Sequence, residues 1–355
     1  MRTRPPPAVE DGRVRRVPES STGPVAPPFP DTEEFRSYPL ADLLTPPPPL
    51  EPPDDLEEFW RETYDELTTA PTAVRVESDE TANDHARGRS VQRITFRSSC
   101  GERTVGWMIG AVPGHPVRRG LVISHGYGGR DLPSPEQIPA DAVAIQPVAP
   151  WLPINPGGLT GAEHVLIGIG DRRHYAHRYS AADIWRAASV LQDRHPEIAG
   201  RLDYRGGSFG GGIGALALPW DGRFRRATLD VPSFGYWPIR LSRRCTGSGE
   251  AVRQHLLDRP DDRPMLDYFD SYLTASRITI DVLVSAARTD PSVDPRGQFA
   301  IYHALAGSKR LVVRTAGHAE FPDEAAENTA VELAGRRFLD AEDVTALPAI
   351  TDLSS

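Results

Sequence analysis

Residues 205–216 read RGGSFGGGIGAL, in which a single serine, Ser208, stands among six glycines. The letters LDY before this stretch are typical of a strand, and the small apolar residues within and after it are typical of a helix. Glycine is favoured where a backbone turns sharply or passes close to another segment. Because these glycines lie between a strand and a helix, we interpret them as a tight corner. A Cβ on Gly206 or Gly210 would collide there with the neighbouring segment.

Residues 206–210 also fit the pattern G-x-S-x-G, which holds a serine hydroxyl exposed on a strained strand-to-helix turn. The serine then lies at the N-terminus of the helix, where backbone N–H groups are free to donate to a developing oxyanion. The alternative is a glycine-rich helix entry that binds phosphate. The lysine of a true phosphate-binding loop is absent, and the corner therefore favours a nucleophilic serine.

Strand-like and helix-like segments alternate along the chain on both sides of this corner. Segments 90–99 and 103–112 have the period of paired strands, and GLVISHG at 120–126 is typical of a buried central strand. The other expected elements are helices at 54–67, 180–196 and 321–339 and strands at 280–290 and 309–318. This alternation predicts an α/β fold with a mainly parallel central sheet flanked by helices.

Proline marks the N-terminal part of the chain, since fifteen of the 35 prolines fall within the first 53 residues. We expect residues 1–36 to form a disordered or loosely packed arm, residues 37–345 a single domain, and residues 346–355 a tail. The helix expected at 54–67 places four large side chains near one face: Leu56, Phe59, Trp60 and Tyr64.

The composition excludes several classes of protein. The formal net charge of −9 argues against a nucleic-acid surface, and no apolar run is long enough to span a membrane. The N-terminus has no apolar core of a signal peptide, so we expect a cytoplasmic protein. The two cysteines, Cys100 and Cys245, make neither a disulfide framework nor a four-ligand metal site; we expect buried or free thiols, with a single disulfide as the alternative.

A serine hydroxyl is a poor nucleophile at neutral pH and needs a base that a carboxylate orients. With this kind of turn, the chain order is serine, then acid, then histidine. Of the three histidines after Ser208, His303 lies on a helical pattern and His255 in a polar segment. His318 follows a strand in the loop TAGHAEF, and we therefore predict that it is the general base.

The candidate acids lie at the ends of strands. Asp290 is the first carboxylate after the strand IDVLVSAA, whereas Asp294 stands before a proline and fits a turn. Asp230 ends another strand in ATLDVPSF and is the alternative. We predict that Asp290 orients the base.

An oxyanion needs a second donor from an early strand-to-helix loop, and ISHGYGGR provides such a loop. We predict that the backbone N–H groups of Tyr127 and Phe209 form the oxyanion hole. His125 precedes the acid in the chain, and we expect it to form structural hydrogen bonds.

These segments resemble the acetyl xylan esterase and cephalosporin C deacetylase family of α/β-hydrolases. The similarity runs from about residue 37 to 340 and is carried by YPLADLLTP, DDLEEFWRETYDEL, HGYGG, YRGGSFGGGIGALAL, DVPSF, ARTDPSVDP and GHAEF. The resemblance implies an α/β-hydrolase fold. It places the family's nucleophile, acid and base on Ser208, Asp290 and His318, and its oxyanion donors on Tyr127 and Phe209.

The sequence departs from the family pattern at three places. AIQPVAPWLPINPGG stands where members carry an R-G-Q segment, Phe209 replaces a frequent glutamine, and GHAE replaces G-H-E. The resemblance implies a small acyl pocket, with aromatic side chains as candidate walls. Trp151 and Trp237 are the candidate substrate-binding residues.

The sequence therefore predicts a serine esterase that hydrolyses short acyl esters, acetyl esters above all, of a sugar or secondary metabolite through an acyl-enzyme. The alternatives are an acyltransferase or cyclase on the same fold and a catalytically silent binding protein. No metal or organic cofactor is expected. The expected partner is a small-molecule ester, with no nucleic acid and no membrane. Since many family members assemble into ring-like hexamers, a homo-oligomer is also among the expectations.

Overall fold

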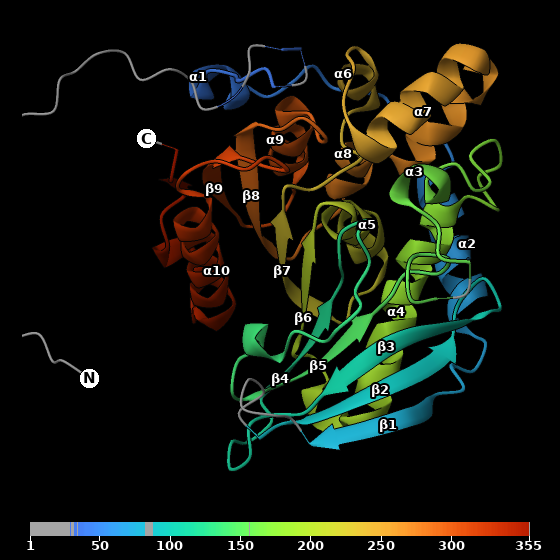
Figure 1. Ribbon diagram of the computed structural model, residues 1–355, viewed down its shortest axis with the longest axis vertical. Coiled ribbons are helices and arrows are strands. Elements are labelled where there is room, and N and C mark those ends of the chain that lie inside the picture. The colour runs from blue at the N-terminus through green and yellow to red at the C-terminus, as the bar shows by residue number, and fades with distance from the viewer. Residues whose placement is uncertain (1–28, 30–31, 34, 82–87, 156, 355) are drawn as a thin grey trace, which may run out of the picture.

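The computed structural model describes residues 29, 32–33, 35–81, 88–155 and 157–354, and in this part of the chain one ten-stranded sheet forms the centre (Figure 1). The strand order is β1-β2-β3-β5-β4-β6-β7-β8-β9-β10. The strands are β1 (Arg75–Thr81), β2 (Ser90–Arg97), β3 (Arg103–Ile109), β4 (Arg119–Ile123), β5 (Ala142–Pro147), β6 (Leu202–Gly207), β7 (Phe224–Asp230), β8 (Asp281–Thr289), β9 (Lys309–Ala316) and β10 (Ile350–Asp352). Most of the expected arm, residues 1–36, lies outside the described residues.

Strand direction divides the sheet into two parts. β1 and β3 both pair antiparallel with β2, which confirms the predicted pair of strands, and β3 is also antiparallel to β5. From β5 to β10, all neighbouring strands are parallel. The prediction of a mainly parallel sheet is confirmed.

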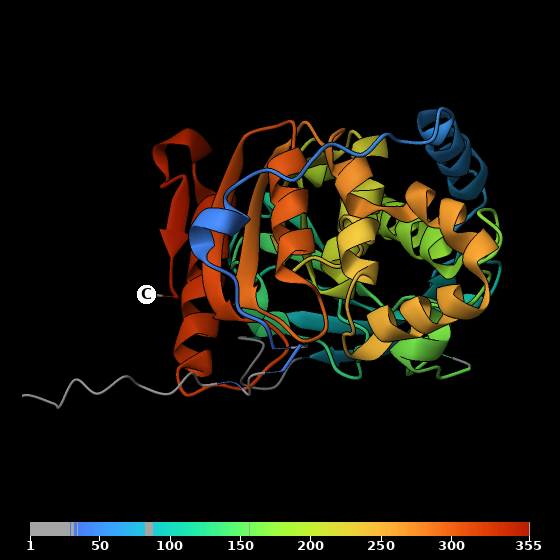
Figure 2. The same cartoon turned by 90° about the horizontal axis from the view of Figure 1, so that it is seen from above.

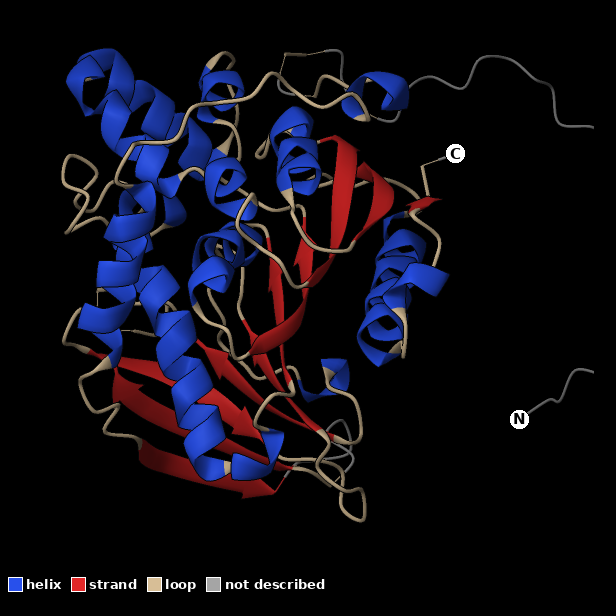
Figure 3. Cartoon of the chain, turned by 180° about the vertical axis from the view of Figure 1, so that it is seen from behind, coloured by secondary structure: helices blue, strands red, loops and turns tan. Residues whose placement is uncertain are grey.

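Helices cover both faces of the sheet (Figures 2 and 3). α4, α5 and α9 pack on one face, and α10 packs on the other face against β7, β8 and β9. The α-helices are α1 (Leu40–Leu43), α2 (Leu56–Thr68), α3 (Gly161–His164), α4 (Ala176–Arg194), α5 (Phe209–Ala217), α6 (Trp237–Leu241), α7 (Gly247–Asp258), α8 (Ser271–Ala275), α9 (Pro295–Ala304) and α10 (Glu324–Asp340). Short 3₁₀ helices are η2 (Pro135–Gln137), η3 (Pro196–Ile198), η4 (Leu218–Trp220), η5 (Pro260–Phe269) and η6 (Val344–Ala346).

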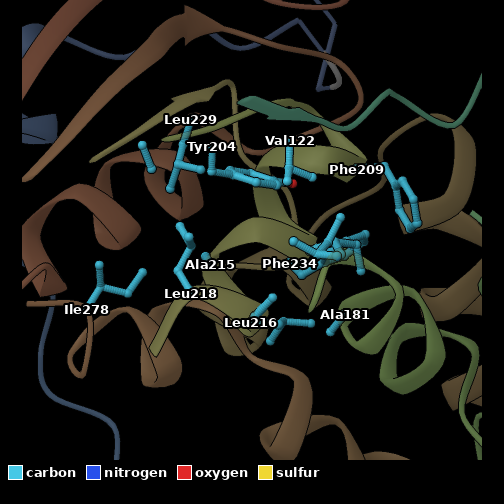
Figure 4. Packing of buried hydrophobic residues seen from close by; sticks show 14 of the residues in the cluster. Val122, Ala181, Tyr204, Phe209, Ala215, Leu216, Leu218, Leu229, Phe234 and Ile278 are labelled. Carbon is cyan, nitrogen blue, oxygen red and sulfur yellow. The ribbon is translucent and has the colours of Figure 1, made fainter. Parts of the chain in front are cut away.

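The parallel strands bury apolar side chains on both faces, as continuous apolar runs in the sequence predict. Val122 of β4 and Tyr204 of β6 pack with Leu216 of α5 in the larger cluster (Figure 4). Leu121, one residue before Val122, faces the smaller cluster under α10. The two clusters hold β4 and β6 rigidly in the middle of the molecule, where β6 delivers Ser208.

The helix expected at 54–67 is α2, and three of its four predicted apolar residues are buried: Leu56, Phe59 and Trp60. Trp60 has no exposed surface. Its ring stacks on Trp220 at 6.3 Å, and its Nε1 donates to the carbonyl oxygen of Tyr268 (2.9 Å). α2 is therefore packed into the domain.

Several elements did not emerge from the sequence pattern, among them β1, β5, α7 and β10. β5 carries AVAIQP, α7 lies in a polar segment, and β10 places part of the expected tail at the edge of the sheet beside β9. Cys100 and Cys245 are free thiols, as expected. Of the helices that the structure describes, none combines the length and apolar character needed to cross a membrane.

The connection from β4 to β5 is unusually bare. These strands are parallel neighbours, and such neighbours are commonly joined through an α-helix that covers one face of the sheet. Here the connection contains only the single turn η2.

Candidate active site

The corner that carries Ser208 lies between β6 and α5. Ser208 has φ 52° and ψ −115°, a backbone conformation that residues other than glycine rarely adopt. An ideal Cβ on Gly206 would lie 2.5 Å from the carbonyl oxygen of Gly210, and one on Gly210 would lie 2.8 Å from the carbonyl oxygen of His125. The predicted collision is confirmed, and the glycines form a tight corner.

Ser208, His318 and Asp290 come together at the carboxyl edge of the sheet. Asp290 follows β8 and His318 follows β9, so their chain order matches the prediction. His318 Nε2 lies 2.8 Å from Ser208 Oγ, and His318 Nδ1 lies 2.8 Å from Asp290 Oδ2. Both distances are those of hydrogen bonds. The geometry is the one that a base-activated serine requires.

Asp290 is fully buried and held by several donors. Its Oδ1 accepts the backbone N–H groups of Ser292 and Val293, each at 2.8 Å. Its Oδ2 accepts the side-chain amide of Gln298 (3.0 Å) as well as His318. These donors fix the carboxylate in place. Gln298 lies on α9, and no motif in the sequence indicated this contact.

Opposing effects act on the imidazole of His318. Burial disfavours its charged form, and the positive charge of Arg240 acts in the same direction. The hydrogen bond and charge of Asp290, together with the charge of Asp230, outweigh both effects and raise the pKa of His318 above its ordinary value. The side chain is 27% exposed, so water can reach it.

The alternative acids have other partners. Asp230, at the end of β7, pairs with Arg314 (3.0 Å) and accepts a hydrogen bond from Ser285. Asp294 caps α9 by accepting the N–H of Arg296 (2.9 Å). Neither carboxylate is hydrogen-bonded to His318.

The alternative bases also lie apart from the serine. His303 lies on α9, and its Nε2 is hydrogen-bonded to the carbonyl oxygen of Leu43 (2.9 Å). His255 lies on α7 and pairs with Asp262 (2.7 Å). Of the three histidines that follow the serine in the chain, only His318 is brought to it.

The loop after β4 places Tyr127 beside the serine corner. An ideal Cβ on Gly126 would lie 3.9 Å from Ser208 Cβ, and the rings of Tyr127 and Phe209 are 4.3 Å apart. The N–H of Phe209 is in the first turn of α5, where N–H groups have no partner within the helix. The Phe209 side chain is fully buried, so the residue faces the site through its backbone.

Two histidines hold this loop. The hydroxyl of Tyr127 shares a hydrogen bond with Nε2 of His177 (2.9 Å), which lies buried on α4 and which the sequence did not indicate. His125 Nδ1 donates to the carbonyl oxygen of Gly126 (2.6 Å), and its Nε2 accepts the N–H of Ala149 (3.0 Å). His125 thus has the structural bonding expected of it.

The two candidate substrate-binding tryptophans differ in exposure. Trp151 is half-buried with φ 62°, and its ring packs near His164 and Tyr179 at 6.3 and 5.8 Å. Trp237 has no exposed surface and stacks with Phe234 at 6.4 Å. Trp237 therefore lies behind the surface of the site.

Arg240 is a further charged residue near the site. Its guanidinium lies over the rings of Phe234 and Trp237 at 5.5 and 5.3 Å, and the residue is 3% exposed. Within the described part of the chain, no hydrogen bond or ion pair reaches this guanidinium. No motif in the sequence indicated this buried cation, because α6 is short and Phe234 lies in a non-periodic loop after β7.

A hollow of about 290 Å³ lies beside the reacting groups and is lined by Ser208, His318 and Val231. It provides room for an ester above the serine hydroxyl. Among the residues that the structure describes, no group of three or more His, Cys, Asp or Glu is arranged to hold a metal ion.

Comparison with known proteins agrees with this architecture. Residues 154–332, half of the chain, match the family model described as acetyl xylan esterase (AXE1). Ser208, Asp290 and His318 fall inside the matched range, and Tyr127 falls before it.

Two solved structures cover nearly the whole domain. The acetyl xylan esterase from Paenibacillus sp. R4 superimposes with a TM-score of 0.71 at 23% identity, over 84% of this chain and 99% of that one. Acetyl xylan esterase 1 from Thermoanaerobacterium sp. JW/SL YS485 gives a TM-score of 0.71 at 18% identity, over 86% and 100%. The acylaminoacyl peptidase of Pyrococcus horikoshii matches at a TM-score of 0.52 and 13% identity, over 76% of this chain and 50% of that one. These likenesses confirm the predicted α/β-hydrolase fold.

Proposed function

The chain belongs to the acetyl xylan esterase family and is thus a carboxylic ester hydrolase for acetyl esters, and we propose that it works through Ser208, His318 and Asp290 on the acetyl ester of a sugar or secondary metabolite. The observation that carries this proposal is the continuous pair of 2.8 Å contacts from Ser208 Oγ through the imidazole to Asp290. Supporting it, Ser208 stands on a strained corner beside an open hollow.

In the first half-reaction, Ser208 Oγ attacks the carbonyl carbon of the ester as His318 Nε2 accepts the hydroxyl proton. The negative charge that develops on the carbonyl oxygen is stabilised by the N–H groups of Tyr127 and Phe209. Asp290 holds the imidazole in the tautomer with hydrogen on Nδ1. The C–O bond to the alcohol then breaks, and His318 returns the proton to the leaving oxygen.

In the second half-reaction, water attacks the acetyl-serine as His318 takes one of its protons. The same two N–H groups stabilise the second oxyanion. Breaking the bond to Oγ releases acetate, and the proton passes from His318 back to Ser208. No step draws on a group outside the chain other than substrate and water.

The test is an assay of 4-nitrophenyl acetate, butyrate and octanoate with the wild type and with Ser208→Ala. We expect acetate to be preferred, and Ser208→Ala to lower kcat by about 10⁶-fold, as loss of such nucleophiles does elsewhere. Absence of wild-type hydrolysis, a preference for octanoate, or equal rates in the variant would each contradict the proposal. Product analysis with added alcohols separates hydrolysis from acyl transfer, because a transferase would form a new ester.

A further inference from the structure

A second hollow, of about 350 Å³, lies between α10 and the sheet and opens into the one beside Ser208. The two hollows share five lining residues: Gly126, Gly207, Asp230, Arg314 and Asn328. We call the combined space the α10 groove. Ser208 and His318 stand at its near end, and the groove runs from them along the face of the sheet.

The groove exists because of the bare connection from β4 to β5. A crossover helix at this point would cover the face of β4 and β6, but the chain provides only η2. This face is instead covered by α10 and by the loop between β4 and β5. α10 lies on that side of the sheet, apart from the other helices (Figure 1). The groove therefore results from the path that the backbone takes between β4 and β5.

The far end of the groove differs from the near end in its charges. The walls of the larger hollow include Ile123, Leu283 and Val331, which are apolar. The charged residues that line only this hollow are listed here: Arg130, Arg205 and Glu332. Arg205 and Glu332 form an ion pair, which leaves Arg130 as the excess charge.

Arg130 is held by neutral groups. Its Nη1 donates to Ser134 Oγ (3.1 Å) and Gln146 Oε1 (3.2 Å), and its Nη2 donates to the carbonyl oxygen of Ser124 (3.2 Å). Within the described residues it has no ion pair, and its Nε is buried without a partner. Burial lowers the pKa of Arg130 to about 10, and Glu136 offsets this only in part.

A cation withdrawn from water is costly unless an anion pairs with it. Asp230 and Arg314 line both hollows and pair with each other, whereas Glu324 lines only the near end and gives it an excess negative charge, which disfavours an anion there. An anionic ligand in the groove is therefore directed to the far end. The planar guanidinium suits the oxygens of carboxylates and phosphates.

We propose that the α10 groove binds the alcohol half of the ester, and that this alcohol carries a carboxylate or phosphate that pairs with Arg130. The inference rests on the proposed function, since it assigns the leaving group of that reaction. The acetyl carbonyl stands at Ser208, the body of the alcohol lies against the apolar walls, and the anion lies at Arg130. Arg130 is then a specificity-determining residue.

The experiment compares acetates that differ only in the charge of the alcohol. The pairs are 3-acetoxybenzoate with 3-acetoxybenzamide, and 3-(4-acetoxyphenyl)propanoate with its amide; 3-acetoxyphenyl phosphate replaces the carboxylate by phosphate. Each kcat/KM is divided by the rate constant of alkaline hydrolysis. We expect at least one anionic substrate to be preferred over its amide by about 10- to 100-fold in the wild type, the range of a charged hydrogen bond.

Variants then test whether Arg130 causes the preference for anionic substrates. Arg130→Gln should bring the ratio of anion to amide close to one, whereas Arg130→Lys should keep a large part of it. A substitution that damages the loop would slow hydrolysis of both the anionic substrate and its amide. Only a change in the ratio of their kcat/KM values therefore reports on recognition of the anion. Arg337→Gln is the matched control, because Arg337 is an exposed cation on α10 that does not line the larger hollow, and its loss should leave the ratio unchanged.

A ratio of one for every anionic substrate in the wild type would overturn the inference, as would an unchanged ratio in Arg130→Gln. Failure of the proposed function has a different signature. In that case the wild type would hydrolyse neither 4-nitrophenyl acetate nor any of the neutral amides.

Discussion

Asp290 and Asp230 end neighbouring parallel strands, yet their surroundings divide their roles. Asp290 is fully buried and hydrogen-bonded to His318, while Asp230 is 41% exposed at its side chain and paired with Arg314. The sequence placed both at the same edge of the sheet, because each follows an apolar run. The loop after β8, which supplies two backbone N–H groups, and α9, which supplies Gln298, distinguish the carboxylate that is held in place.

The first prediction follows from this difference. Asp290→Asn should lower kcat on 4-nitrophenyl acetate by about 10⁴-fold, because the amide favours the wrong imidazole tautomer. Asp230→Asn should lower it by less than about tenfold, since its contact with the base is through charge alone. Steady-state kinetics of the two variants measure the contrast. A larger loss of kcat in Asp230→Asn than in Asp290→Asn would indicate that Asp230 is the residue that orients the base.

The second prediction concerns pH. The base must be neutral, so kcat/KM rises as pH passes through the pKa of His318, which lies above its ordinary value. Asp230 helps to raise that pKa, and Asp230→Asn should therefore move the rising limb to lower pH. The profile is measured from pH 5 to 9 at constant ionic strength. A limb that moves upward in the variant would contradict the assigned charge effect.

At the scale of elements, the third prediction concerns the β6–α5 corner. Gly206→Ala would place a methyl group 2.5 Å from the carbonyl oxygen of Gly210, and backbone cannot give way cheaply. We expect a loss of about 1–3 kcal/mol in the free energy of unfolding, together with a loss of activity as Ser208 is displaced. Gly222→Ala is the control, because a Cβ there meets nothing within 4 Å. Denaturant unfolding and aryl acetate kinetics report the two effects.

Helices and strands with a strong sequence pattern were predicted, whereas those whose position depends on contacts with neighbouring elements were not. α4 and α10 carry helical spacing over many residues, and β8 is a long apolar run. α7 has few buried residues and owes its position to α3 and η5. β5 is short and ends in proline, so its six letters do not distinguish a strand from a loop until β3 and β4 pair with it.

At the scale of the whole molecule, α2 packs against α4 and η4 and, together with α1 against α9, attaches the N-terminal part of the described chain to the rest of the domain. The fourth prediction is that Trp60→Ala costs about 3–5 kcal/mol of unfolding free energy, because a fully buried indole leaves a cavity between α2 and η4. Activity per folded molecule should remain near that of the wild type, since Trp60 lines neither of the two hollows beside the reacting groups. Thermal unfolding followed by circular dichroism measures the loss, with exposed Glu58→Ala as control.

The catalytic residues were predictable because parallel strands bring their carboxyl ends to one edge. Ser208, Asp290 and His318 are far apart in the chain, but each follows a strand of the same sheet. The residues that pack around the catalytic groups and hold them were not predictable in this way. His177 and Arg240 reach it from α4 and α6, and nothing in their local sequence specifies where those helices pack.

The single turn between β4 and β5 has a consequence for how this scaffold can change. The connection, residues 124–141, is already as long as a crossover that holds a helix, so it lacks helical sequence and not length; exposed Asp131 and Leu132 offer a place to insert such a sequence. A helix grafted there would plug the far end of the groove without touching the nucleophile. Under our proposal for the groove, insertion and deletion in this loop should change the range of leaving groups while every reacting atom stays in place.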